Sequence, residues 1–472
     1  MTRVFQKKNL MTLAFLAAAL HALLGTMMYF FQVAPLWTID YALLGVLTAA
    51  VVIYAALQPA APRPDTAQWL LIGYILWYVV CCLAMGIKYN NDWVSYNIEP
   101  LLNTAVSLLV LFPLGCAVAR GGWVKTGKLL MAFIMLAWSA FMVFVLIRVF
   151  RGGVILTPNG GAILMRAGSL RLNCNPNTTG AIELVFLLGC CYAACRAKRV
   201  VWKALFGFSA LVHCIALILS NSRTAVFAAL PALGGSAGIM VYLALKNKKN
   251  ATRLVIALLA GLAVAGAFYS LRGQVFSLYN ASASSAQQTQ AAEEAADSTA
   301  ETAASGQARD LLTNGEINLS GRLPIWKATL GGITSSFRTF IFGVTPPSVP
   351  SMIDQVRGTN HNYYSHNQFL EVAAATGVPG LCIFLVWLAI IGKDMIHLFF
   401  RQKERSTLLV LPVLILSLLL ANMTEATLMY YHFLEGYAFF FLCGILHGAV
   451  SETPKEAKPS RQAIRKKNRK KK

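Results

Sequence analysis

Residues 101–119, LLNTAVSLLVLFPLGCAVA, contain no charged side chain and are apolar almost throughout. A helix needs about 20 predominantly apolar residues to cross the roughly 30 Å hydrocarbon core of a bilayer, so this run is long enough to span a membrane. Further runs of this kind lie near 10–31, 40–57, 67–87, 128–147, 179–195, 203–220, 224–244, 252–270, 378–400, 406–421 and 427–447. The sequence therefore predicts an all-α polytopic membrane protein with about twelve transmembrane helices.

The composition agrees with this prediction. The chain is 57% hydrophobic and only 13% charged over its 472 residues, with a mean hydropathy of +0.59, which is too apolar for a soluble domain of this length. All of the ten cysteines except Cys174 lie within predicted spans, where cysteine acts as a small apolar residue. We therefore expect neither a disulfide framework nor a metal site.

The net charge of +22 could suggest nucleic acid, but the distribution of the 41 basic residues points to a membrane. With the N-terminus inside, every even-numbered connection is basic, as the positive-inside rule requires. Both termini are then cytoplasmic, and the first run, which follows Arg3, Lys7 and Lys8, is a retained helix and not a cleaved signal. We expect the basic tail to lie on anionic lipid or in solvent, with no nucleic-acid partner.

Two predicted outward connections are long, one at about 148–178 and a larger one after span nine. Within the larger one, the residues from Asn280 to Ala308 are almost all Ala, Ser, Gln, Thr and Glu, which favours disorder or a weak solvated helix. The predicted organisation is transmembrane helices one to nine in 1–270, an extracytoplasmic loop in 271–377 with a low-complexity part (280–308) and a structured cap (319–377), transmembrane helices ten to twelve in 378–447, and a basic cytoplasmic tail in 448–472.

One polar motif in the large loop could carry chemistry. Ser365 is followed three residues later by Gln368, which predicts a capping box and a short helix of about 366–376 that ends at Gly377. His366 would then lie in the first turn, where the helix dipole keeps an imidazole neutral and able to accept a proton from a hydroxyl. A histidine that only hydrogen-bonds within the cap fits the spacing equally well.

Three arginines on the same predicted side are candidates for binding an anion. Arg322 precedes a helix predicted to start near Leu323, and Arg223 lies in a polar break between two apolar runs. Arg171 lies in the polar segment that precedes span six, and an ordinary turn would account for the polar residues there. An unpaired surface arginine is the competing interpretation for Arg322, and snorkelling to lipid headgroups is the competing one for Arg223.

Together these motifs resemble those of the O-antigen ligase and O-antigen polymerase superfamily (WaaL and Wzy types). The resemblance covers roughly residues 170–395 and rests on the order and spacing of motifs that are weak individually. They are Asn175-Pro176-Asn177, Ser222-Arg223-Thr224-Ala225, Gly321-Arg322 with Ile325-Trp326, His366-Asn367 with Leu370-Glu371, and Gly377-Val378-Pro379-Gly380.

The resemblance implies a GT-C-like membrane glycosyltransferase that needs no metal or cofactor. Such enzymes take a glycan from undecaprenyl pyrophosphate and transfer it to an acceptor hydroxyl on a glycan, lipid or protein, at the extracytoplasmic face of the bacterial inner membrane. If the roles of the family's motif residues apply at the matching positions here, His366 would be the catalytic residue, and Arg223 and Arg322 would hold the donor pyrophosphate. Arg171, Asn367 and Glu371 would be further substrate-binding residues.

Two other functions remain as alternatives. A transporter or flippase of lipid-linked glycans shares the layout of about twelve spans with both ends inside, although the sequence has no internal repeat and places its His and Arg residues in an outer loop instead of at mid-membrane. A structural assembly subunit is the second alternative. A flippase should tolerate loss of His366, whereas the enzyme should lose turnover.

Overall fold

The computed structural model describes residues 64–451, except 90–92, 120–123, 152–154, 158–159, 163–164, 167, 173–175, 246, 294–311, 314–315, 318–320, 362, 402–409 and 432–433. The predicted spans near 10–31 and 40–57, most of the predicted low-complexity segment and the basic tail beyond 451 lie outside the described residues.

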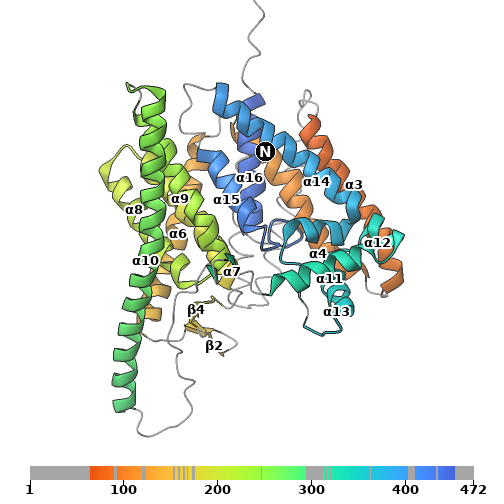
Figure 1. Ribbon diagram of the computed structural model, residues 1–472, viewed down its shortest axis with the longest axis horizontal. Helices are drawn as coiled ribbons and strands as arrows, with labels where there is room; N and C mark the ends of the chain where they lie inside the picture. Colours follow the sequence, from red (N-terminus) through yellow and green to blue (C-terminus); the bar gives the residue numbers. More distant parts are fainter. Residues whose placement is uncertain are drawn as a thin grey trace, which may run out of the picture.

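Helices dominate the described part of the chain (Figure 1). They are α3 (Thr66–Tyr89), α4 (Trp93–Ala105), the π-helix η1 (Val106–Leu111), α5 (Phe112–Ala119), α6 (Val124–Phe150), α7 (Pro176–Arg196), α8 (Val200–Leu219), α9 (Arg223–Ala244), α10 (Asn250–Glu293), α11 (Arg322–Thr334), α12 (Phe337–Phe342), the 3-10 helix η2 (Pro346–Ser348), α13 (Val349–Arg357), α14 (Gln368–Arg401), α15 (Val410–Ala421) and α16 (Leu434–Ser451).

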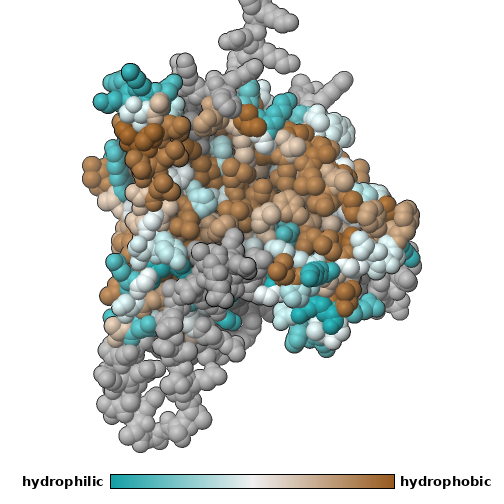
Figure 2. Space-filling view, in the orientation of Figure 1, coloured by the Kyte–Doolittle hydropathy of each residue, from teal (hydrophilic) through white to brown (hydrophobic). Residues whose placement is uncertain are grey.

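Within the described residues, nine helices are long and apolar enough to cross a membrane, and each overlaps a predicted span. α15, at 12 residues, is a shorter apolar helix within the predicted span 406–421. The all-α polytopic fold is therefore confirmed, while the total of about twelve spans stays a prediction. Figure 2 shows hydrophobic residues across the middle of the molecule and hydrophilic residues gathered at its lower edge, around α11 and α13.

Three short antiparallel hairpins, which the sequence did not predict, lie in the connections. They pair β1 (Ile155–Thr157) with β2 (Gly160–Ala162), β3 (Met165–Arg166) with β4 (Ser169–Leu170), and β5 (Leu312–Thr313) with β6 (Glu316–Ile317). Each hairpin is an isolated pair of strands, so the fold class is unchanged.

Two helix boundaries differ from the prediction. α10 continues past residue 270 to Glu293, so the beginning of the predicted loop is helical. The helical segment after residue 367 bends at Gly377, where φ is 71° and ψ is 177°, and then continues as the following span. The predicted stop at Gly377 is thus a kink between two consecutive helices, and only glycine adopts this backbone conformation readily.

Two buried hydrophobic clusters organise the bundle. One cluster includes residues of all the helices from α6 through α10, around Trp138. The other includes residues of α3, α5, α14 and α16, around Trp387, and the two clusters define two halves of the bundle. α15 packs against both α9 and α16 and so connects the two halves. Residues 422–431, which follow α15 and lead towards α16, therefore lie at the junction of the two clusters.

Candidate functional site

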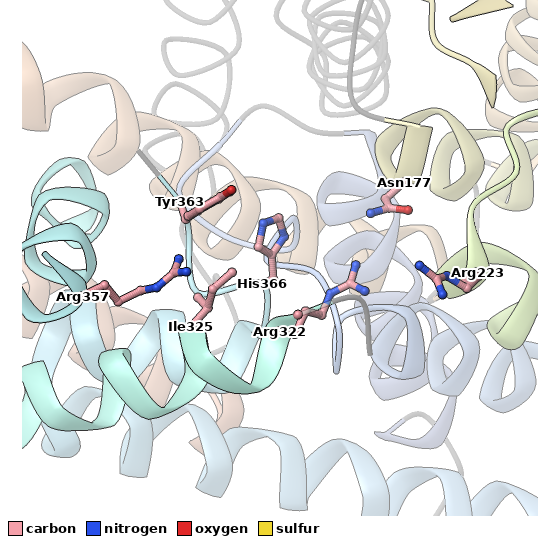
Figure 3. A pocket seen from close by; sticks show the side chains of 8 residues that line it. Asn177, Arg223, Arg322, Ile325, Arg357, Tyr363 and His366 are labelled. Carbon is pink, nitrogen blue, oxygen red and sulfur yellow. The ribbon is translucent and has the colours of Figure 1, made fainter. Parts of the chain in front are cut away.

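A cavity of about 350 Å³ lies where the two halves of the bundle meet (Figure 3). It is lined by Asn177, Arg223, Gly321, Arg322, Ile325, Arg357, Tyr363 and His366. Three arginines and a histidine are in this set, and no carboxylate is, among the residues that the structure describes. The cavity therefore favours an anionic ligand.

Several helices begin at this cavity. Arg223 is the first residue of α9, Arg322 is the first residue of α11, and Asn177 is the second residue of α7. His366 lies two residues before the start of α14. Since the N-terminus of a helix carries a partial positive charge, these helix ends add to the positive potential of the arginines.

The carboxylate of Glu425 contacts three residues that line the cavity. Its Oε1 accepts hydrogen bonds from Asn177 Nδ2 at 2.6 Å and from Arg322 Nη2 at 2.5 Å, and its Oε2 lies 3.2 Å from His366 Nδ1. The side chain is 9% exposed. One buried carboxylate therefore fixes three side chains that are 59 to 248 residues away in the sequence.

The network continues from Asn177 to the start of α9. Asn177 Oδ1 accepts from Ser222 Oγ at 2.9 Å, and Ser222 Oγ accepts in turn from the backbone N–H of Ala225, which makes Ser222 the N-cap of α9. Because Arg223 follows this cap directly, the start of α9 is linked to Glu425 through the Asn177 side chain. The motifs around Asn177, Ser222, Arg322 and His366 thus meet in one connected arrangement.

Burial and the neighbouring cations act in opposite directions on the pKa of Glu425. Burial raises it, but the hydrogen bond and charge of His366 and the charge of Arg322 outweigh burial and lower the pKa below its usual value. The carboxylate is therefore ionised at neutral pH and can only accept hydrogen bonds.

His366 lies before the helix and not in its first turn, which corrects the prediction. Its φ of 48° is left-handed, and α14 begins at Gln368. The argument for a neutral imidazole, which placed the ring in the first turn of the helix, therefore loses its premise. Glu425 instead defines the orientation of the ring: Nδ1 donates to the carboxylate, which leaves Nε2 as the nitrogen that can accept a proton.

The predicted capping box is also wrong in detail. Asn367 caps α14, because its Oδ1 accepts from the backbone N–H groups of Phe369 and Leu370. The Ser365 hydroxyl lies 2.5 Å from Glu371 Oε2 and 3.0 Å from the backbone carbonyl oxygen of Asn367, and it has one hydrogen to donate to either. The Ser365 N–H also donates to Glu371 Oε2, and these contacts hold the turn. Asparagine is as good an N-cap as serine, and the sequence alone did not distinguish them.

The remaining predicted binding residues do not line the cavity. Asn367 donates through Nδ2 to the carbonyl of Met423, and Glu371 is fully buried behind Ser365. Arg171 follows β4 and lies outside the lining. In this structure Asn367 and Glu371 position the turn that carries His366, and direct contact of these three residues with substrate stays a prediction.

Three site residues escaped the sequence analysis. Glu425 lies in the short polar segment between two apolar runs, on the side predicted to face outward, and that position was a usable signal. Arg357 ends α13 and Tyr363 lies in the following loop. No local pattern distinguishes these two from ordinary residues of a surface loop.

The fold and the cavity define a polytopic membrane protein with a cationic, histidine-containing site at the ends of its helices. A family model described as O-antigen ligase matches residues 204–385, which include Arg223, Arg322 and His366. This match confirms the resemblance to the O-antigen ligase and polymerase superfamily. It supports a membrane glycosyltransferase-type enzyme that acts on lipid-linked glycans. A comparison with curated proteins finds no match.

Proposed function

We propose that this protein transfers a glycan from undecaprenyl pyrophosphate to an acceptor hydroxyl, without a metal and with inversion at the reducing-end sugar. The observation that carries the proposal is the contact of Glu425 with both His366 and Arg322, because it places a proton acceptor beside an anion-binding group. The acceptor can be a glycan, a lipid or a protein side chain, and ligase and polymerase chemistry are the same at this site.

The donor diphosphate lies, in this proposal, between Arg223 and Arg322. Arg322 gives one N–H to Glu425, and its Nε is buried without a partner among the described residues, so its remaining donors can bind phosphate oxygens. The N-cap of α11, Gly321, has no side-chain capping bond, which leaves the first-turn N–H groups available to the same anion.

His366 acts as the general base. Nε2 takes the proton of the acceptor hydroxyl as the acceptor oxygen bonds to the anomeric carbon. The bond between that carbon and the diphosphate oxygen breaks, and its electron pair stays on the diphosphate. The two arginines stabilise the charge that builds there, which is the role a divalent metal plays in other phosphate-leaving reactions.

Reconstitution tests this proposal. Full-length protein in liposomes, with undecaprenyl-pyrophosphate oligosaccharide, candidate acceptors and EDTA, should release undecaprenyl pyrophosphate and elongate the acceptor. His366→Ala should lose at least 100-fold in kcat yet still bind donor, and Arg322→Ala should weaken donor binding. Lys327→Ala, an exposed residue of α11, is the matched control and should behave as wild type. Full turnover by His366→Ala would contradict the assigned role.

We also propose that the cavity opens to the extracytoplasmic side of the bacterial inner membrane, with both termini in the cytoplasm. The proposal follows from the positive-inside distribution, which puts residue 177, residue 223, the loop with His366 and the segment with Glu425 on the same outer side. In a cysteine-free background, a membrane-impermeant thiol reagent should label a cysteine introduced at exposed Lys327 in intact cells, and one introduced at Lys248, in the α9–α10 connection, only after the membrane is permeabilised.

A further inference from the structure

We propose that Arg357 and Tyr363 form a second anion-binding subsite, which receives a carboxylate or phosphate group carried by the acceptor sugar. This inference rests on the proposed function and names a substrate class for it. The subsite is distinct from the diphosphate position, since it lies on the other side of His366 from Arg322 and Arg223, as Figure 3 shows.

The two side chains hold each other in place. The guanidinium carbon of Arg357 lies 5.2 Å from the centre of the Tyr363 ring, within the range of a cation–π contact. Arg357 Nη1 is buried and has no hydrogen-bond partner among the described residues. A stacked, pre-oriented guanidinium with an unused buried N–H is suited to a planar or tetrahedral oxyanion.

The cavity supplies no negative charge on this side. Glu425 forms an ion pair with Arg322, and none of the described lining residues is acidic. A buried guanidinium N–H without an acceptor costs free energy, which a ligand recovers when it supplies an acceptor. A charged oxyanion makes a stronger hydrogen bond to the guanidinium than a hydroxyl does, so an anionic ligand should bind more tightly than a neutral one.

The direction of the reaction assigns this subsite to the acceptor. In a direct displacement the attacking oxygen and the leaving diphosphate lie on opposite faces of the anomeric carbon. His366 must contact the attacking hydroxyl, and the diphosphate lies toward Arg223. The acceptor therefore approaches from the side of Arg357 and Tyr363.

Binding measurements test the subsite without requiring turnover. The probes are cellobiose, cellobiouronic acid and cellobiose 6′-phosphate, titrated into full-length protein in nanodiscs; the two anionic sugars separate a carboxylate from a phosphate source. Wild type should bind at least one anionic probe tenfold or more tightly than cellobiose. Arg357→Gln should abolish that preference, Arg357→Lys should keep part of it, and Lys327→Gln should keep all of it.

Three results would overturn the inference. One is equal binding of neutral and anionic probes by wild type. Another is an anion preference that survives in Arg357→Gln but disappears in Arg223→Gln, which would place the probe at the diphosphate position. The third appears in the transfer assay, if Arg357→Gln raises the KM for donor and not for anionic acceptor. If wild type shows the anion preference but no transfer activity, the proposed reaction fails while the anion subsite itself is retained.

Discussion

Glu425→Gln tests the centre of the site with an isosteric change. The amide cannot accept hydrogen bonds from Asn177, Arg322 and His366 together, because one of its two terminal atoms is a donor. If the amide nitrogen faces His366, the imidazole must take the other tautomer, and Nε2 then carries the proton it should accept. A charge-assisted hydrogen bond is worth roughly 1.5–3 kcal/mol. At about 1.4 kcal/mol per tenfold, kcat should fall by about 10- to 150-fold.

The same change releases Arg322 from its ion pair, so the KM for donor should stay the same or decrease. The measurement is steady-state release of undecaprenyl pyrophosphate, with donor and acceptor varied separately. Glu183→Gln is the matched control: Glu183 is another fully buried carboxylate, 2.7 Å from His213 Nδ1 and outside the cavity. It should lower Tm without lowering kcat. A kcat within threefold of wild type for Glu425→Gln, or an equal loss in both variants, would refute the reasoning.

The pH dependence of the same pair gives a further measurement. The pKa of Glu425 is lowered in the folded protein, so its contribution to stability is complete above the unfolded value of about 4.3 and is lost as the pH falls through the folded value. The difference in Tm between wild type and Glu425→Gln should shrink as the pH falls from about 5 to below about 4. A difference that grows on acidification would contradict the assigned ionisation.

Three other predictions concern the supporting structure. Gly377→Ala should prevent stable folding or lower Tm sharply, because a Cβ at φ 71° would lie 2.0 Å from the Ile341 carbonyl oxygen, whereas Gly331→Ala, with its nearest contact at 3.6 Å, should be nearly neutral by thermal unfolding. Asn367→Ala should cost about 1 kcal/mol of stability through the lost N-cap and lower kcat with little change in the KM for donor. EDTA should leave transfer unchanged, because arginines stabilise the leaving diphosphate; a requirement for added Mg²⁺ in the same assay would contradict this.

The sequence was sufficient to predict the spans because their signal is local. A run such as 101–119 is apolar on every face, and only a helix satisfies its backbone in lipid. The distribution of basic residues then predicted that four connections share one side of the membrane. The structure brings residues from all four, Asn177, Arg223, His366 and Glu425, into one site.

The partners within the site were not predictable in this way. Glu425 contacts Arg322 across 103 residues and Asn177 across 248, and no periodicity or spacing encodes such a pairing. The error at Ser365 has a different origin, because Ser365 and Asn367 are both good caps and lie two residues apart. Tertiary contacts decided between them, since Glu371 bonds to Ser365 and leaves Asn367 to cap the helix.

The backbone of His366 explains why these supporting residues are needed. A non-glycine residue at φ 48° costs of order 1–3 kcal/mol and persists only where its surroundings enforce it. Glu371 fixes Ser365 on one side, Asn367 caps α14 on the other, and Trp326 Nε1 donates to the His366 carbonyl at 3.4 Å. If residue 366 continued the helix instead, it would gain a relaxed backbone but lose the turn that holds the imidazole against Glu425. The strained backbone of residue 366 is therefore what places the imidazole of the proposed base. Asn367 and Glu371 can affect turnover by maintaining this backbone, without touching the substrate.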